Sequence, residues 1–360
     1  EVYPDFRVCR SNDLMVRGGA FYAIWDQEKG MWSTDEYDVQ RLVDQELYAY
    51  RDHMQNSDAY ISVMAMQDFS SRSWVQFKTY VSHMSDSVHQ LDEKLTFSNT
   101  TVKKKDYVSK RLPYPLEQGS CDAYDEIIGT LYDPGERAKL EWAIGSIIAG
   151  DSVDIQKFVV LYGEAGAGKS TILNIIQKLF EGYYITFDAK ALGSANNAFS
   201  TEVFKSNPIV AIQHDGDLSR IEDNTKINSI VSHAEMTVNE KFKATYTSKI
   251  NSFLFMATNR PVKITDAKSG IIRRLIDVKP SGRKIPVARY HALMSQIDFE
   301  LGAIAWHCQE VYRGMGKNYY SGYRPLEMIF QTDVFFNFVE SSYDTFLEED
   351  GVSLSRAYDM

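Results

Sequence analysis

Short, continuous apolar runs alternate with longer segments of helical spacing through the middle of the chain. Such runs occupy 157–162 and begin the segments 207–218 and 251–260, and their β-branched and aromatic residues are typical of buried strands. Buried strands separated by helical segments predict an α/β fold built on a central parallel sheet. The helical spacing after the first run is carried by Ile172, Ile175, Ile176 and Leu179.

The flanking regions have other patterns. Residues 18–32 alternate as in a small hairpin that turns at Gly30, and helical spacing follows through Tyr50. After Pro286 the pattern is helical, and both ends look cut, so we expect a fragment of a longer protein. The predicted regions are a small α/β accessory domain over 1–115, a linker and lead-in helices over 116–150, the core over 151–285 and a C-terminal helical region over 286–360.

Length and composition bound the class of protein. With 360 residues, 44% of them hydrophobic, the chain can bury a large core in two or three domains. The apolar run at 142–150 is far too short to cross a bilayer, and no secretory leader opens the sequence. Cys9, Cys121 and Cys308 are odd in number and far apart, which argues against a disulfide framework. We expect a globular cytoplasmic protein without a membrane partner.

The formal net charge of −10 argues against a surface that is basic overall, so any nucleic-acid contact has to be local. Two strand-like runs within 236–253 predict a hairpin that carries Lys241 and Lys243, with Lys249 on the return strand. Such lysines ordinarily protect a solvated strand edge, and they can also contact DNA phosphates. The basic, proline-punctuated linker at 103–113 allows the same two interpretations.

The strongest motif joins the first predicted strand to the first predicted helix. Its spacing is Gly163-x-x-x-x-Gly168-Lys169-Ser170, in which glycines let backbone N–H groups turn toward phosphate oxygens. Lys169 is predicted to reach the β- and γ-phosphates, and the Ser170 hydroxyl to bind Mg²⁺. Loops of this kind serve kinases, GTPases and motor ATPases alike. The predicted nucleotide-binding residues are Gly163, Glu164, Ala165, Gly166, Ala167, Gly168, Lys169, Ser170 and Thr171.

Polar residues end the next two predicted strands. Asp215 is our first choice for the carboxylate that holds Mg²⁺ with Ser170, and Asp217 is the second. A glutamate commonly follows such an aspartate and polarises the attacking water. Gly216 stands in that place, so the roles of the two aspartates stay open. Asn259 ends the third run, where its amide could reach the γ-phosphate or the water.

Two adjacent arginines, Arg273 and Arg274, lie in an otherwise apolar, strand-like run with no acidic residue before Asp277. One interpretation is that their heads reach water or a distant carboxylate, because an unpaired buried charge is costly. Neighbours on a strand face opposite sides, so the pattern does not choose between them.

The segments "GEAGAGKST", "VAIQHDGDL", "FMATN" and "GIIRRL" follow in this order, with the lysine-bearing hairpin between the second and third. In this order and spacing, residues 150–285 resemble the superfamily 3 helicases, a compact branch of the AAA+ ATPases. The closer likeness is to the helicase portion of phage and poxvirus-type primase-helicases. The resemblance implies an AAA+ P-loop core with a pore hairpin, a collar-like domain before it, and a winged-helix-like unit after it, of which this chain holds only the start.

The resemblance also implies roles and partners. Arg274, with Arg273 as the lesser candidate, would enter the nucleotide site of a neighbouring subunit, so the missing carboxylate would be a phosphate. Lys241, Lys243 and Lys249 would grip single-stranded or forked DNA in the pore of a homo-oligomeric, hexameric ring. The implied activity is ATP-dependent DNA unwinding in phage or mobile-element replication, in the bacterial host cytoplasm, with a fused or associated primase and 3′ to 5′ movement.

Two other classes of function stay open. An ATP-dependent initiator or scaffold with slow hydrolysis remains, because the Asp-Gly-Asp sequence at 215–217 departs from the usual pattern. A P-loop small-molecule kinase is the third class, although it needs an arginine-rich lid and has no use for a lysine hairpin. A GTPase is disfavoured, because no Asn-Lys-x-Asp sequence is present.

Overall fold

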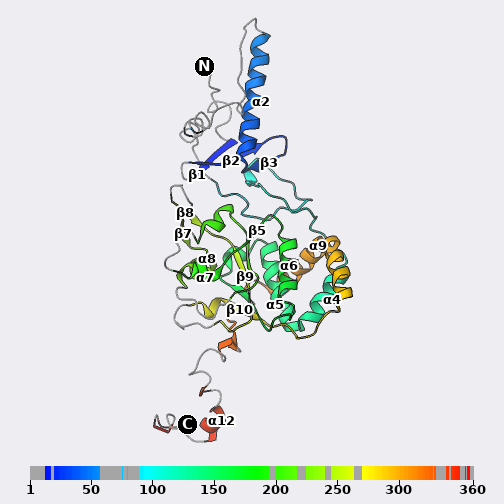
Figure 1. Cartoon of the computed structure of the whole chain (residues 1–360), viewed down its shortest axis with the longest axis vertical. Coiled ribbons are helices and arrows are strands. Elements are labelled where there is room, and N and C mark those ends of the chain that lie inside the picture. Colours follow the sequence, from blue (N-terminus) through cyan, green and yellow to red (C-terminus); the bar gives the residue numbers. More distant parts are fainter. Residues whose placement is uncertain are drawn as a thin grey trace. The chain divides into compact units, whose positions relative to one another are not determined.

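The computed structural model of the chain divides into two compact units (Figure 1). Unit 1 comprises Glu1–Leu116, Phe204–Asn207 and Glu235–Ile250, and unit 2 comprises Glu117–Val203, Pro208–Ala234 and Asn251–Met360. The four-part division expected from the sequence stays a prediction. The structure describes residues 13–17, 20–56, 75, 79, 89–194, 200–216, 224–239, 245–262, 270–326, 328–329, 338–339, 342–348, 353 and 355–356.

Unit 2 is built on a five-stranded sheet in the order β10-β4-β9-β6-β5, and every neighbouring pair is parallel. All six residues of β9, at the centre, are buried. Apolar runs without alternation suit such a strand, because both faces of a parallel sheet are covered. The predicted α/β fold with a parallel sheet is confirmed. The strands are β4 (Phe158–Tyr162), β5 (Tyr184–Thr186), β6 (Val210–Gln213), β9 (Phe253–Thr258) and β10 (Leu275–Val278).

Helices α5 and α9 pack closely beside this sheet. A Cβ atom added to Gly145 would lie 2.0 Å from the Cys308 carbonyl oxygen, so only glycine allows this approach of the two backbones. Trp142 Nε1 donates to the Gly316 carbonyl at 3.0 Å and fixes the other end of the contact. The helices of unit 2 are α4 (Asp122–Leu131), α5 (Pro134–Ile148), α6 (Lys169–Leu179), α7 (Ala189–Leu192), α8 (Thr225–Val231), α9 (Val287–Met315) and α12 (Tyr343–Glu348), with 3-10 turns at Ser152–Asp154 and Ile272–Arg274. A further 3-10 turn, Glu202–Ser206, begins in unit 2, and its residues from Phe204 onward belong to unit 1.

Unit 1 contains the predicted hairpin and helix. The turn falls at Gly30, whose φ of +61° is a left-handed conformation that glycine adopts without strain. The Asp35 side chain caps the helix by accepting from Tyr37 N at 2.9 Å. A hydrophobic core of unit 1 combines Leu14 and Ile24 from the sheet with Val39, Val43 and Leu47 from one face of the helix. The elements are β1 (Leu14–Arg17), β2 (Ala20–Asp26), β3 (Met31–Ser33), α2 (Glu36–Gln55), a 3-10 turn at Lys104–Asp106 and the separate hairpin of β7 (Glu235–Val238) and β8 (Tyr246–Lys249).

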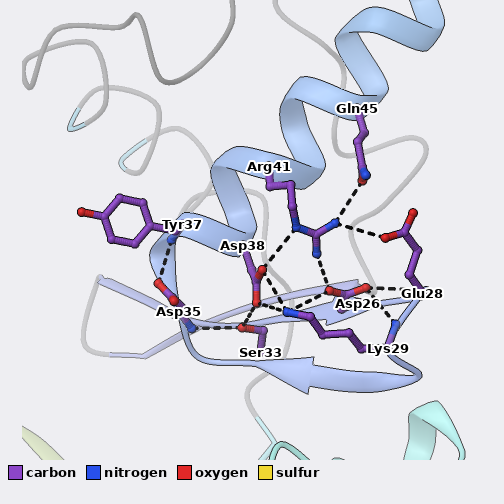
Figure 2. Close-up of polar contacts among 9 residues, drawn as sticks. All are labelled: Asp26, Glu28, Lys29, Ser33, Asp35, Tyr37, Asp38, Arg41 and Gln45. Carbon is purple, nitrogen blue, oxygen red and sulfur yellow. Dashed lines mark hydrogen bonds and ion pairs between the residues drawn. The ribbon is translucent and has the colours of Figure 1, made fainter.

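A charge network holds the β2–β3 turn against α2 (Figure 2). The fully buried Asp26 carboxylate accepts from the backbone N–H of Lys29 at 3.1 Å and pairs with the Arg41 guanidinium. Asp38 accepts from Lys29 Nζ at 2.9 Å and from Ser33 Oγ at 2.6 Å. Lys29 and Arg41 pair with Asp26, Glu28 and Asp38, and the remaining carboxylate, Asp35, caps the helix, so we assign this cluster a structural role.

A second network joins three helices of unit 2. The Glu141 carboxylate, 4% exposed, accepts from Arg137 Nε at 2.7 Å and contacts His307 Nε2 at 2.9 Å. Arg137 also donates to Asp125 Oδ1 at 2.5 Å. The hydrogen bond with Glu141 raises the pKa of His307 above its usual value, although burial opposes this.

We expect the His307 contact to stabilise the protein at low pH. A group whose pKa is raised by folding adds stability below its unfolded pKa and loses it as pH rises through the folded pKa. Wild type should therefore exceed His307→Gln in free energy of unfolding by up to about 1 kcal/mol near pH 5.5, since a partly exposed pair is screened. Urea denaturation at several pH values measures the gap, which should narrow toward pH 8.5. A gap that is constant with pH would remove this assignment.

Candidate functional site

The Gly-rich loop lies between the end of β4 and the start of α6, as the motif predicts. Gly166 and Gly168 have φ values of +76° and +98°, which turn successive backbone N–H groups in a way other residues rarely allow. A Cβ atom on Gly168 would also lie 2.9 Å from the Leu131 side chain. Both backbone angle and space therefore demand glycine at residue 168.

The Lys169 ammonium lies in the middle of the loop. Its Nζ donates to the carbonyl oxygens of Gly163 at 2.6 Å and Glu164 at 2.7 Å, and to Asn259 Oδ1 at 2.7 Å. Burial lowers the pKa of Lys169, and the charge of Asp215 opposes this. The lysine is 7% exposed, and all three of these partners are neutral oxygens, so an anion would compete well for it.

Three chain segments converge at this edge of the sheet because their strands are parallel neighbours. Gly163 N donates to the Thr258 carbonyl at 3.3 Å, and Gly216 N donates to the Ala257 carbonyl at 3.1 Å. The start of the loop, Asn259 and Asp215 are thereby brought together, as expected for residues at the carboxyl ends of adjacent strands. Asp217 lies outside the described residues.

Gly216 has a packing reason to be glycine. A Cβ atom there would lie 2.1 Å from Nε2 of Gln213, which is 7% exposed and accepts from Ala189 N at 3.1 Å. A glutamate in this place would displace the Gln213 side chain. Burial lowers the pKa of the neighbouring His214, which favours its neutral form.

Residues outside the motif, which were not predicted from the sequence, brace the loop. Tyr132 Oη donates to the Gly168 carbonyl at 3.3 Å, and Ser281 N donates to the Leu131 carbonyl at 2.7 Å. Pro280 Cδ lies 3.2 Å from where a Gly163 Cβ atom would be. These residues follow α4 and β10, and no local pattern relates them to the motif.

The expectation that the two adjacent arginines lie in a strand is wrong. Arg273 and Arg274 lie in the 3-10 turn Ile272–Arg274 and not in the strand, which begins at Leu275. Because β10 runs parallel to β4 with Leu275 opposite Phe158, the turn lies at the edge of the sheet opposite the Gly-rich loop.

The contacts of Arg274 are neutral. Its Nη1 donates to Asn228 Oδ1 at 2.8 Å and its Nη2 to Gln156 Oε1 at 3.4 Å, while the buried Nε has no partner. Burial and the neighbouring Arg273 lower the pKa of Arg274. No carboxylate of the described residues pairs with either arginine. The absence of an acidic partner therefore persists in the folded protein.

Lys157 adds to the positive charge around Arg273 and Arg274, at the end of the sheet opposite the Gly-rich loop. It is 8% exposed, and its Nζ donates to the Arg273 carbonyl oxygen. Burial lowers the pKa of Lys157 to about 8, with smaller contributions from Arg324 and Arg273. A lowered lysine pKa among arginines marks positive charge that nearby carboxylates do not neutralise.

The lysine-bearing hairpin is present. Strands β7 and β8 pair antiparallel from Glu235 opposite Lys249 to Val238 opposite Tyr246. Lys249 is exposed at the base of the hairpin, and its carbonyl accepts from Gln90 Nε2 at 3.3 Å. Lys241 and Lys243 lie outside the described residues. The hairpin is confirmed, and its role stays a prediction.

Comparisons with other proteins give limited likenesses. A family of unknown function, DUF5906, matches residues 161–274, from the end of β4 to Arg274. The chain is similar to two apo structures of the NrS-1 C-terminal region, at 12% and 11% identity, with TM-scores of 0.44 and 0.43. The matches cover 71% and 70% of this chain and 66% of each of those chains, slightly less than two thirds of their length. No curated protein matches the sequence. Within the part of the chain that the structure describes, no helix is long and apolar enough to span a bilayer.

Proposed function

We propose that the chain is an ATPase of the AAA+ class and superfamily 3 type, which moves along DNA by hydrolysing ATP between subunits of a homo-oligomeric, hexameric ring. The observation that carries this proposal is the convergence of Lys169, Asn259 and Asp215 beside the Gly-rich loop. The setting we propose is phage or mobile-element DNA replication in the cytoplasm, with a fused or associated primase.

ATP and Mg²⁺ fit the residues present. Backbone N–H groups of the loop and the Lys169 ammonium would hold the phosphates, and Ser170 with Asp215 would hold the metal. Bound Mg²⁺ neutralises charge on the phosphate oxygens. Among described residues, no cluster of His, Cys, Asp or Glu could hold a metal by itself, so the ion would be shared with the phosphates. Asn259 contacts the Lys169 head directly and is placed to respond to what Lys169 binds.

Strand geometry supports an arginine that acts between subunits. Arg274 precedes β10 at the level of Lys157, whereas the Gly-rich loop follows Tyr162 at the other end of β4. Five strand residues separate the two levels by roughly 16 Å, which is beyond the reach of an arginine side chain. Arg274 could therefore contact a nucleotide only on another copy of the chain. The unpaired positive charge around Arg274 would suit the phosphates of that nucleotide.

A scaffold or initiator with slow hydrolysis remains the second candidate. Its support is Gly216, since the packing of Gln213 against it leaves no room for a glutamate beside Asp215. Asp215 or Asp217 would then have to orient the attacking water. ATP turnover in the presence and absence of single-stranded DNA separates a translocase from a scaffold.

The hairpin lysines give the sharpest test of the DNA partner. We expect single-stranded DNA to stimulate ATP turnover in wild type, and Lys243→Ala to reduce the ratio of turnover with and without DNA toward one. The reason is that a lysine contact to phosphate is lost, which should also lower the salt slope of DNA affinity by about 0.7. A coupled assay of ADP release measures the ratio.

Lys190→Ala is the matched control, because Lys190 is an exposed lysine on α7, outside the hairpin. It should keep the wild-type ratio. An unchanged ratio in Lys243→Ala would remove the hairpin assignment. No stimulation in wild type would favour the scaffold.

A further inference from the structure

The basic segment expected to be a linker is folded onto the small sheet of unit 1. Trp32 of β3 donates its backbone N–H to the Val108 carbonyl and its indole Nε1 to the Lys104 carbonyl, both at 2.8 Å. The Asp92 carboxylate accepts from the backbone N–H of Ser109 at 2.7 Å. The segment is therefore held in one conformation by bonds to Lys104, the first residue of the 3-10 turn Lys104–Asp106, and to Val108 and Ser109 after it.

Aromatic rings stack from the core of unit 1 to its surface. Trp25 meets Trp32 edge-on at 5.9 Å, and Tyr107 stacks on Trp32 at 5.6 Å. His89 stacks on Tyr107 at 4.1 Å with only 18° between the ring planes. Trp32 is 2% exposed, Tyr107 is half-buried and His89 is exposed, so the stack ends at the surface. Tyr107 has a φ of +51°, a strained angle for a non-glycine residue that helps to set its ring position.

Lysines precede Tyr107 in the same ordered segment. Lys103 and Lys105 are exposed, and neither forms an ion pair with any residue the structure describes. Lys104 and Lys110 are used internally: Lys104 pairs with Asp13, and Lys110 donates to the Ser206 carbonyl at 3.1 Å. Residues 103–106 are three lysines and Asp106, whose carboxylate accepts from Lys103 N at 2.7 Å, so this stretch keeps a net positive charge in a chain of net charge −10.

We infer that His89, Lys103, Lys105 and Tyr107 form a stacking surface that binds single-stranded DNA. A base would stack on His89 with Tyr107 behind it, and the two lysines would contact the adjoining phosphates. Aromatic rings beside unpaired cations are the features by which proteins hold single strands without reading sequence. A duplex hides the faces of its bases, and an acidic peptide has no planar bases to stack.

The choice of single-stranded DNA as the ligand rests on the proposed function. The stacking surface itself is a further contact in unit 1, separate from the hairpin lysines. Exposed lysines alone are ordinarily just solvated. Here the segment is fixed in advance by Trp32 and Asp92, so little conformational entropy is lost when a strand binds.

The first experiment measures affinity of the full chain for labelled oligothymidylate by fluorescence anisotropy across a salt series. Lys103→Ala/Lys105→Ala should weaken binding and lower the slope of log affinity against log salt by about 1.4, the value for two phosphate contacts. The charge-matched control is Lys190→Ala/Lys284→Ala, which removes two exposed lysines elsewhere and should leave the slope unchanged.

The second experiment tests stacking. His89→Ala should weaken oligothymidylate binding by roughly tenfold, the loss typical of one stacked base, and His89→Phe should restore it. Binding of a duplex of the same length should be the same in all three proteins. Thermal unfolding of each variant checks that the sheet is intact.

Several results would overturn the inference. One is that the lysine variant and His89→Ala both bind oligothymidylate with the affinity and salt slope of wild type. Another is that His89→Ala weakens binding of duplex as much as binding of oligothymidylate. The others are that wild type binds oligouridylate more tightly than oligothymidylate, or that polyglutamate competes with DNA in wild type and no longer does so in the lysine variant. If wild type binds oligothymidylate and shows DNA-stimulated turnover while both variants behave as wild type, only the stacking surface fails. If wild type does not bind single strands, the proposed function fails with it.

Discussion

Lys169→Ala should abolish ATP turnover. The Lys169 ammonium lies within 2.7 Å of three oxygens of Gly163, Glu164 and Asn259, at the point where the loop would hold the transferred phosphate. Removing it takes away the charge that offsets negative charge on the phosphate oxygens, and turnover should fall by on the order of 10³-fold or more. Steady-state ADP release at saturating ATP measures the loss.

Lys178→Ala is the control for this variant. Lys178 lies on the same helix α6, and its Nζ pairs with Asp298 at the surface, away from the loop. The control should retain wild-type turnover and lose at most about 1 kcal/mol of stability. Measurable turnover in Lys169→Ala above a few per cent of wild type would show that the loop does not hold a reacting phosphate.

The elements around the Gly-rich loop were predictable because their signals are local. The run Phe158–Tyr162 reads as a buried strand, and Gly163 to Ser170 dictates a turn that begins a helix. The polar ends of β6 and β9 follow the same rule, since parallel strands deliver their carboxyl ends to one edge. Asp215, Asn259 and Lys169 could therefore be grouped from the sequence.

Features that depend on distant contacts could not be predicted. Arg273 and Arg274 looked like strand residues, because the apolar pattern of 271–278 continues through the 3-10 turn. Tyr132 braces Gly168 only because α4 packs beside the loop. Gly216 was a departure from a pattern in the sequence, and only the position of Gln213 gives it a physical reason.

The basic segment at 103–111 is another feature that depends on a residue far away in the sequence. Its lysines and following proline are typical of a solvated linker. Its conformation depends on Trp32, about seventy residues earlier, whose indole and backbone N–H groups fix the segment in place. The sequence of the segment includes Tyr107 but not Trp32 or His89, so it does not by itself predict the aromatic stack.

Arg274→Ala should also be inactive, and an equal mixture with Lys169→Ala should regain activity. If each site takes Lys169 from one subunit and Arg274 from its neighbour, half of the subunits in a mixed ring supply each residue. Roughly a quarter of the interfaces would then contain both, so turnover should recover toward that fraction if sites act independently. Turnover of the premixed variants, against each alone, measures the recovery.

The physical basis of this expectation is the position of the turn Ile272–Arg274 at the opposite sheet edge from the loop. An arginine that neutralises transferring phosphate is worth about 10³- to 10⁵-fold in turnover, so the loss in Arg274→Ala should be unmistakable. Arg273→Ala tests the lesser candidate: Arg273 is exposed, and this variant should keep near-normal turnover if Arg274 is the residue that acts. Two dead variants without recovery would mean that Arg274 acts within its own subunit or holds the fold. Near-normal turnover in Arg274→Ala alone would make the arginine pair structural, and the kinase and scaffold functions would have to be reconsidered.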